Sequence, residues 1–396
     1  MSGASPATLA HGRIPVTLVT GFLGSGKTTL INAALRSPDL AKTVVVVNEF
    51  GEVGLDQKLF ARSSDAVVVL ENGCLCCTVR SDLIGTLNSL FHSRQAGEIP
   101  FFDNVVIETS GLADPGPVLQ AFLSEPTLEG LFRVASVVTL VDAVNWRGTS
   151  EDHDESVRQV ALADQIRITK LDLAAGDRNE AEASARRELR RISPSAEIGV
   201  VDFTSASVAK LLTSKGFDAA NPKADPRPWL NLEAHLTGGA HEDDICEHDH
   251  HGHDHSHRHH EAHSHFNHLQ GKGIESFVLT REPPLSRGEL QFLLDGIAQN
   301  LGAGLLRVKG LVNIAEEPGR PAVIQGAQHL LHTMTWLDQW PDDDHRTRVV
   351  FITQGIPRAN LKDVIDLLDR VSSRTFKARA RGRQAMQDSS STADKL

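Results

Sequence analysis

The stretch Gly21-Phe-Leu-Gly-Ser-Gly-Lys-Thr28 decides the fold of this chain. It fits the pattern G-x-x-x-x-G-K-[ST], with an apolar run before it and a helix-forming run after it. The glycines permit a tight loop whose amide groups point inward at phosphate oxygens, and the N-terminus of the following helix adds favourable partial charge. Lys27 would neutralise the β- and γ-phosphates, and the Thr28 hydroxyl would bind Mg²⁺. The alternative, a glycine-rich turn with a chance lysine, is disfavoured by the flanking runs. The residues expected to hold the phosphates are Gly21, Gly24, Ser25, Gly26, Lys27, Thr28 and Thr29.

Outward from this loop, short apolar runs alternate with helical patterns over the first two hundred residues. Buried strands rich in valine and isoleucine are expected at Val16–Thr20, Thr43–Asn48, Ala66–Leu70, Asn104–Glu108, Val134–Val141 and Gln165–Thr169. Helices are expected at Thr28–Arg36, Ser81–His92 and Arg178–Ile192. This rhythm predicts an α/β fold, a P-loop domain over residues 13–215 with a mainly parallel sheet and helices on both faces.

The pattern decays after about Ser214, and residues 216–272 are predicted to form a linker with a disordered, His-rich stretch. Order returns at Gly273, and residues 273–371 predict a smaller α+β C-terminal domain. Its expected elements are Ile274–Arg281, Leu305–Ile314, Ala322–Gln325, His329–Leu337 and Arg348–Ile352 as strands, and Arg287–Leu301 and Asn360–Val371 as helices. Residues 372–396 are polar and are predicted to form a disordered tail.

The composition excludes some classes of function. The chain has 396 residues, 40% of them hydrophobic and 23% charged, which is ordinary for a globular protein with room for two domains. Its net charge of −11 argues against nucleic acid or an anionic membrane as a partner, because both would repel it. No apolar run approaches the about 18 residues of a membrane helix, and residues 1–13 lack a signal-peptide core, so a cytoplasmic location is predicted.

A second phosphate-site signal lies in Val105-Val-Ile-Glu-Thr-Ser-Gly111, an apolar strand that ends in an acid. A carboxylate at the carboxyl end of a neighbouring strand can hold Mg²⁺ or its water, and the Gly111 amide can meet the γ-phosphate. Strand-terminal acids are common, so this interpretation depends on the P-loop. With it, Lys27 and Glu108 are the predicted catalytic residues.

The base-binding prediction rests on Thr169-Lys-Leu-Asp172, which ends another apolar run. Guanine presents two adjacent donors that one carboxylate can accept, whereas adenine presents an acceptor and would leave a carboxylate badly paired. Asp172 is therefore the predicted guanine-reading residue, and the Lys170 stem is expected to pack over the base. The alternative is a pair of solvated loop charges.

Three of the four cysteines, Cys74, Cys76 and Cys77, crowd into four positions. Such a cluster cannot staple distant parts of a chain, and in a reducing compartment it is typical of a metal or redox site. Thiolates are the ligands that Zn²⁺ prefers, and a helix that begins near Ser81 would favour them. Glu49 is the first candidate for a fourth ligand. Three reduced core cysteines are the alternative.

Residues 241–268 hold 12 of the 19 histidines. Imidazoles such as those of His248, His250, His253 and His255 can bind Zn, Ni, Co or Cu, although weakly, since a floppy chain must be ordered to bind. The stretch is interpreted either as a weak site that collects metal ions or as a solvated linker.

Together these motifs resemble the CobW-like metallochaperone GTPases. The matching segments are Thr20–Thr29, Asn48–Asp56, Glu71–Cys77, Glu108–Pro115 and Val141–Asp142, followed by a C-terminal segment from Gly273 to about Val371. Position 169 departs from the pattern, since it is threonine where many GTPases carry asparagine. The resemblance implies slow hydrolysis of GTP with Mg²⁺, zinc or another transition metal held at the C-x-C-C motif, and delivery of that metal to a client metalloprotein.

Three alternatives stay open. The delivered metal could be cobalt or iron, for cobalamin synthesis or nitrile hydratase maturation, although three thiolates favour zinc. The chain could be a P-loop kinase or ATPase with incidental cysteines. It could also be a non-enzymatic metal buffer dominated by its histidines. A homodimer is a further possibility.

Overall fold

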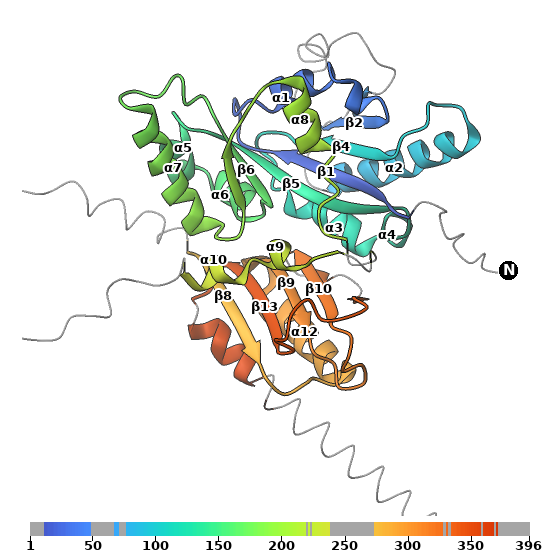
Figure 1. Cartoon of the computed structure of the whole chain (residues 1–396), viewed down its shortest axis with the longest axis vertical. Helices are drawn as coiled ribbons and strands as arrows, with labels where there is room; N and C mark the ends of the chain where they lie inside the picture. Colours follow the sequence, from blue (N-terminus) through green and yellow to red (C-terminus); the bar gives the residue numbers. More distant parts are fainter. Residues whose placement is uncertain are drawn as a thin grey trace, which may run out of the picture.

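The computed structural model describes residues 12–48, 67–70, 77–218, 221, 224–237, 273–327, 330–331, 334–357, 359–367 and 370. Two β-sheets organise these residues, a helix-covered parallel sheet above and an antiparallel sheet below, with short helices between them (Figure 1). The predicted fold class, a P-loop α/β domain followed by a smaller α+β domain, is confirmed.

The first sheet has the strand order β3-β2-β4-β1-β5-β6-β7 within the described ranges, and every pairing in it is parallel. Its strands are β1 Ile14–Thr20, β2 Thr43–Asn48, β3 Val67–Leu70, β4 Asn104–Glu108, β5 Phe132–Asp142, β6 Gln165–Thr169 and β7 Glu197–Val200. The last was not predicted, because its sequence Glu-Ile-Gly-Val is short and half polar.

Helices cover both faces of this sheet, as the continuous apolar strands require. Alternate β1 side chains face opposite sides: Val16 and Leu18 pack with α2–α4, whereas Val19 packs with α1 and α8. The helices are α1 Lys27–Ala34, α2 Cys77–Ala96, α3 Gly116–Ser124, α4 Pro126–Leu131, α5 Trp146–Asp152, α6 Asp154–Ala161, α7 Arg178–Ile192 and α8 Ser205–Leu212, with a 3₁₀ turn at Pro38–Leu40.

The second sheet is antiparallel, with the order β11-β10-β9-β13-β8 and β12 beside β10. Its strands are β8 Ile274–Arg281, β9 Leu305–Val312, β10 Ala322–Ala327, β11 Leu330–Leu331, β12 Thr335–Trp336 and β13 Thr347–Gln354. Helix α12, Arg287–Leu301, begins with a capping box between Ser286 and Glu289 and covers one face. A 3₁₀ turn follows it at Gly302–Gly304, and residues 359–367 are helical.

Two sequence expectations need correction. The predicted strand His329–Leu337 is instead two short strands, β11 and β12, whose pairings with β10 differ in register by one residue. The predicted linker contains two short helices, α9 Arg227–Leu230 and α10 Leu232–Thr237, which pack apolar side chains on the second face of the antiparallel sheet. The His-rich stretch and the tail lie outside the described residues.

The two domains meet through a buried ion cluster and apolar side chains. Asp164, at the start of β6, accepts hydrogen bonds from Arg307 and Lys309 of β9, both at 2.8 Å. Burial alone would raise the pKa of Asp164, but these two cations hold it far below its ordinary value. Leu306 and Ile352 complete the contact by packing among the side chains of α6, α7 and β6.

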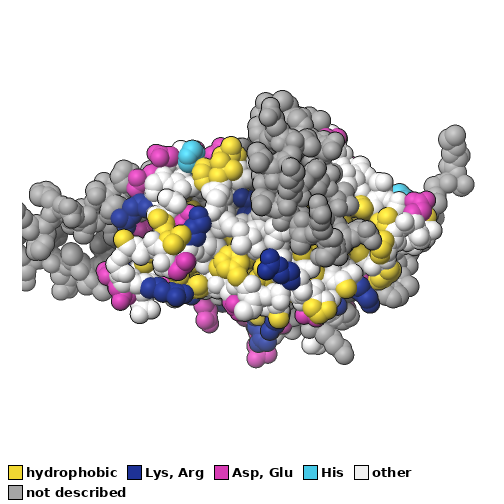
Figure 2. Space-filling view, turned by 90° about the horizontal axis from the view of Figure 1, so that it is seen from above, with side chains coloured by type: hydrophobic (Ala, Val, Ile, Leu, Met, Phe, Trp, Pro, Cys, Tyr) yellow, Lys and Arg dark blue, Asp and Glu magenta, His cyan; other side chains and the backbone are white. Residues whose placement is uncertain are grey.

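The surface that faces away from the C-terminal domain mixes acidic, basic and apolar side chains in small groups (Figure 2). The most exposed large apolar residues of the P-loop domain include Leu23 and Leu173. Among the described helices, none is long and apolar enough to cross a membrane.

Candidate nucleotide and metal site

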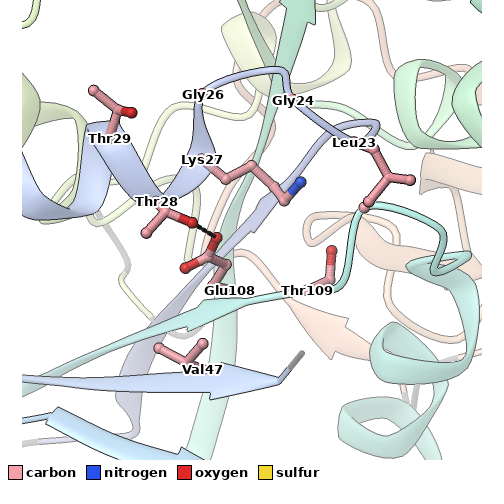
Figure 3. Close-up of a pocket in the computed structure, with 10 residues that line it drawn as sticks. Leu23, Gly24, Gly26, Lys27, Thr28, Thr29, Val47, Glu108 and Thr109 are labelled. Atoms are coloured by element: carbon pink, nitrogen blue, oxygen red, sulfur yellow. Dashed lines mark hydrogen bonds between the residues drawn. The ribbon is translucent and has the colours of Figure 1, made fainter. Parts of the chain in front are cut away.

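A cavity of about 250 Å³ opens at the carboxyl edge of the parallel sheet. The loop between β1 and α1 forms one side of it, and the ends of β2 and β4 form the other (Figure 3). Its lining residues are Leu23, Gly24, Gly26, Lys27, Thr28, Thr29, Val47, Glu108, Thr109 and Gly111. The carboxyl edge is where ligands bind in open parallel sheets.

The glycine pattern of the loop has a steric cause. Gly21 has φ of +138°, and a Cβ there would lie 2.4 Å from the backbone oxygen of Leu140. No other residue fits that turn, by which the chain leaves β1. Gly26 then precedes α1 with φ of +100°, and α1 begins at Lys27. The first turn of α1 therefore contributes its amide groups to the cavity.

Lys27 lies folded across the loop and is largely buried. Its Nζ donates to the backbone oxygens of Gly21 at 2.8 Å and Phe22 at 3.2 Å. The ammonium group is thereby held at the wall of the cavity, where it can exchange these carbonyl contacts for phosphate oxygens with only a small movement of the side chain.

Thr28 and Glu108 form the polar centre of the cavity. The Thr28 hydroxyl donates to Glu108 Oε1 at 2.9 Å, and Glu108 is only 4% exposed (Figure 3). Both groups are hard oxygen donors, the type that Mg²⁺ prefers, and adjacent ligand oxygens of octahedral Mg²⁺ lie about 3 Å apart. The pair therefore fits Mg²⁺ in chemistry and in spacing.

The loop after β4 touches the P-loop directly. A Cβ at Gly111 would lie 2.7 Å from the backbone nitrogen of Leu23, so only glycine permits this approach. Thr109, buried beside it, donates through Oγ1 to Thr20 at the end of β1. These contacts keep Gly111 at the wall of the cavity, where the sequence predicted a contact with the γ-phosphate.

The loop after β6 lies beside the P-loop but does not line the cavity. The buried Thr169 hydroxyl is 2.9 Å from the backbone oxygen of Ser25 and 3.2 Å from that of Val141, so it joins the loop after β6 to the P-loop. This position is one where many GTPases carry asparagine, and threonine supplies the donor here. Asp172 is exposed.

Lys170 adopts a left-handed backbone, with φ of +58°, which is uncommon outside glycine. Its Nζ donates to Asp142 Oδ2 at 2.8 Å. Burial alone would raise the pKa of Asp142, but hydrogen bonds from Lys170 and Asn145 lower it below its ordinary value. A Cβ added at Gly24 would lie 3.9 Å from the Lys170 ammonium, so the aliphatic part of the Lys170 side chain runs toward the P-loop.

The predicted metal ligands are only partly within the described residues. Glu49, Cys74 and Cys76 lie outside them, as do His248, His250, His253 and His255. Cys77 is the first residue of α2, so this helix begins four residues earlier than predicted. In the part of the chain that the structure describes, no three His, Cys, Asp or Glu side chains are grouped as metal ligands would be.

The structure brings seven predicted residues to one cavity: Gly24, Gly26, Lys27, Thr28, Thr29, Glu108 and Gly111. Gly21 and Ser25 shape the loop without lining the cavity, and Lys170 and Asp172 lie beyond it. Sequence reasoning missed Leu23, Val47 and Thr109. Val47 ends an apolar strand and carried no signal of its own, whereas Thr109 directly follows Glu108 and could have been inferred from that position.

This fold and cavity define a P-loop nucleotide-binding protein. Residues 15–199 match the model of the CobW/HypB/UreG nucleotide-binding domain, and residues 274–367 match that of the cobalamin synthesis protein cobW C-terminal domain. The chain belongs to the CobW family.

Named relatives support this assignment. The chain is 30% identical over 349 residues to the zinc chaperone YjiA of Escherichia coli, covering 88% of this chain and 96% of that one. It is 35% identical over 192 residues to the zinc-regulated GTPase metalloprotein activator 1 of Schizosaccharomyces pombe, covering 47% and 45%. The crystal structure of Zn(II)-bound YjiA GTPase from E. coli matches with a TM-score of 0.58 and 26% identity, covering 90% of this chain and 99% of that one.

Proposed function

We propose that this protein is a GTP-hydrolysing metallochaperone that carries zinc and delivers it to a client metalloprotein. The observation that carries the proposal is a single line of residues across four neighbouring strands. Val19 of β1 pairs with Glu108 of β4, Glu108 with Val47 of β2, and Val47 with Val69 of β3. The nucleotide cavity and the strands that lead to the predicted metal ligands thus end at one edge of one sheet.

The P-loop holds the triphosphate, and its own residues perform most of the catalytic work. Lys27 leaves the carbonyls of Gly21 and Phe22 to neutralise charge that develops on the transferred phosphoryl group. Thr28 and Glu108 would hold Mg²⁺, which would supply further charge neutralisation when bound. The Gly111 amide contacts the γ-phosphate.

The base is guanine. Asp172 is exposed in the loop after β6 and accepts hydrogen bonds from the two adjacent donors of guanine. The aliphatic part of the Lys170 side chain runs toward the P-loop, where it packs over the base. Thr169 keeps this loop in register with the phosphates through its contact with Ser25. ATP would leave the Asp172 carboxylate without matching donors, which supports selectivity for GTP over ATP.

Zinc is the cargo, and its thiolate ligands are Cys74, Cys76 and Cys77, with Glu49 as the fourth ligand. Neighbouring strands lie about 4.8 Å apart, so the three steps from β1 to β3 span roughly 14 Å. Val47, which lines the cavity, precedes Glu49 by two residues, and Leu70 at the end of β3 precedes Cys74 by four. This proximity supports coupling between nucleotide and metal occupancy, which thermodynamic linkage makes reciprocal.

Three thiolates favour zinc over cobalt, and the curated relatives are named for zinc. The His-rich stretch adds weak sites that collect metal. Reduced thiols need a reducing compartment, so the protein acts in the cytosol. The client docks on the C-terminal domain.

Titration of the full chain tests the proposal. Zn²⁺ affinity is measured with bound GTPγS or GDP, in the natural protein and in a Cys74→Ser, Cys76→Ser, Cys77→Ser variant. We expect tight Zn²⁺ binding that changes with the nucleotide and is lost in the triple variant. Deletion of residues 242–268 serves as the control and should spare it. Equal Zn²⁺ affinity in the two nucleotide states would refute the coupling, and ATP that competes as well as GTP would refute the guanine assignment.

A further inference from the structure

Helix α6 connects the loop after β4, which includes residues 109–115, to strand β5. Gln159 of α6 is 1% exposed and donates through Nε2 to the backbone oxygens of Gly111 at 3.1 Å and Ala113 at 2.9 Å. Its own backbone oxygen accepts from the buried Thr139 hydroxyl of β5 at 2.8 Å. One buried amide therefore holds the backbone on both sides of Leu112, so this loop and α6 are linked as one unit.

The neighbouring residue, Arg158, reaches two elements that no local interaction would bring together. Its Nη1 lies 3.2 Å from Asp114 Oδ2 in the loop after β4, and its Nε donates to Gln354 Oε1 at 2.8 Å, at the end of β13 in the C-terminal domain. Asp114 in turn accepts from the backbone nitrogen of Gly116 at 2.8 Å, where α3 begins. The planar guanidinium suits this role, because it presents donors in two directions at once.

The Arg158 contacts differ in kind from the ion cluster just beyond α6. Arg307 donates to the backbone oxygen of Leu162, and Asp164 is enclosed by Arg307 and Lys309. Those groups are largely buried, so separating them would leave charges without partners. The Arg158 side chain is 33% exposed, against 14% for Arg307 and 9% for Lys309, so water competes more readily for its contacts. The interface thus combines two buried cations on one carboxylate with a more exposed arginine contact.

We propose that Arg158 is the positioning residue through which the γ-phosphate loop and the C-terminal domain sense each other. The proposal rests on the proposed function, because it assumes that Gly111 contacts the γ-phosphate. A displacement of Gly111 moves Asp114 in the same loop, and Arg158 passes that movement to Gln354 on β13. Linkage requires the reverse effect as well, so the state of β13 changes the preference of the protein for GTP over GDP.

A double-mutant cycle on the full chain tests this. Arg158→Ala and Gln354→Ala are compared singly and together, with the affinities for fluorescent GTPγS and GDP measured in the presence of Mg²⁺. Gln354 belongs to the C-terminal domain and lines no part of the nucleotide cavity, yet we expect its loss to change the GTPγS-to-GDP affinity ratio by about fivefold, the low end of typical allosteric coupling. Arg158→Ala should change the ratio at least as much, and the double variant no more than Arg158→Ala.

Arg147→Ala is the matched control. Arg147 of α5 also pairs with a carboxylate, that of Glu188, at 3.3 Å, but it contacts neither the loop after β4 nor β13. Its replacement should leave the affinity ratio unchanged. Backbone hydrogen exchange in β13 is the second measurement: a difference between the GTPγS and GDP states in the natural protein should disappear in Arg158→Ala. A general loss of stability would instead raise exchange in every element of Arg158→Ala, in both nucleotide states.

The outcomes separate the two proposals. If the natural protein fails to bind guanine nucleotides, the proposed function and the inference fall together. If it binds them and the affinity ratio is the same in all variants, or β13 exchange is insensitive to the nucleotide, the inference alone is refuted. Additive effects of Arg158→Ala and Gln354→Ala would also refute it, since they would show that the two side chains act separately.

Discussion

We predict that Glu108→Gln abolishes most Mg²⁺-dependent nucleotide hydrolysis while leaving the fold intact. The substitution keeps the shape of the side chain and removes one charge from a buried position 2.9 Å from the Thr28 hydroxyl. Because a buried carboxylate is replaced by a neutral group of equal volume, no cavity forms, and the P-loop domain should unfold at nearly the natural temperature.

The size of the effect follows from the charge lost beside the ion. Two unit charges 4 Å apart interact by about 4 kcal/mol at an effective dielectric constant of 20, and solvent relaxation reduces this. A loss of about 2–4 kcal/mol corresponds to a roughly 30- to 1000-fold weaker affinity for Mg²⁺, at 1.36 kcal/mol per tenfold change. Glu108→Asp keeps the charge but withdraws it by one methylene group, so its defect should be intermediate.

The assay is single-turnover GTP hydrolysis over a range of Mg²⁺ concentrations. Asp103→Asn is the matched control, because Asp103 is exposed and precedes the opposite end of the same strand. We expect Glu108→Gln to need far more Mg²⁺ and Asp103→Asn to behave as the natural protein. A Glu108→Gln variant with the natural Mg²⁺ requirement and the natural rate would refute the assignment of Glu108.

Four further outcomes follow from single contacts. Thr169→Val should lower the free energy of unfolding by about 1–3 kcal/mol in urea titrations, since it leaves backbone acceptors unpaired, and Thr169→Asn should recover most of it. Gly111→Ala would set a methyl group 2.7 Å from a backbone nitrogen of the P-loop; the displaced loop should slow single-turnover hydrolysis on the order of 10²-fold. Asp164→Asn leaves two buried cations unpaired and should cost about 3–5 kcal/mol in guanidinium unfolding; a cost below about 1 kcal/mol would contradict the account of the domain interface. Burial, with the charge of Lys309, lowers the pKa of His235 to about 4. Between pH 6.5 and 4 only the unfolded chain therefore takes up this proton, so the free energy of unfolding falls as the pH drops, by roughly 2 kcal/mol at pH 5. The His235→Gln variant should lose that part of the pH dependence.

Most residues of the P-loop that line the cavity were predictable, because the pattern that marks them is local. A P-loop needs glycines at fixed spacing, then Lys27 and Thr28, and those requirements are met within eight consecutive residues. Glu108 was predictable because it ends an apolar run, and the carboxyl ends of parallel strands share an edge. The strand boundaries Thr43–Asn48, Asn104–Glu108 and Gln165–Thr169 likewise agree with the structure.

The base loop shows the limit of motif reasoning. Position 169 holds threonine where many GTPases carry asparagine, yet its hydroxyl reaches the backbone oxygen of Ser25, which is 144 residues away in sequence. The left-handed backbone of Lys170 and its contact with Asp142 also depend on β5 and β6 lying side by side. The identity of one residue in the sequence does not indicate which distant residues it will contact in the fold.

The sequence by itself determined the local elements, the phosphate loop and the division into two domains, because apolar periodicity and glycine spacing act over a few residues. Only the tertiary structure decided the strand order β3-β2-β4-β1-β5-β6-β7, which sets Glu108 beside Thr28. It also brought Arg158 within hydrogen-bond distance of both Asp114 and Gln354. These contacts depend on how the crossover helices pack strands and domains together, and that packing is a collective result of many buried side chains rather than of any one motif.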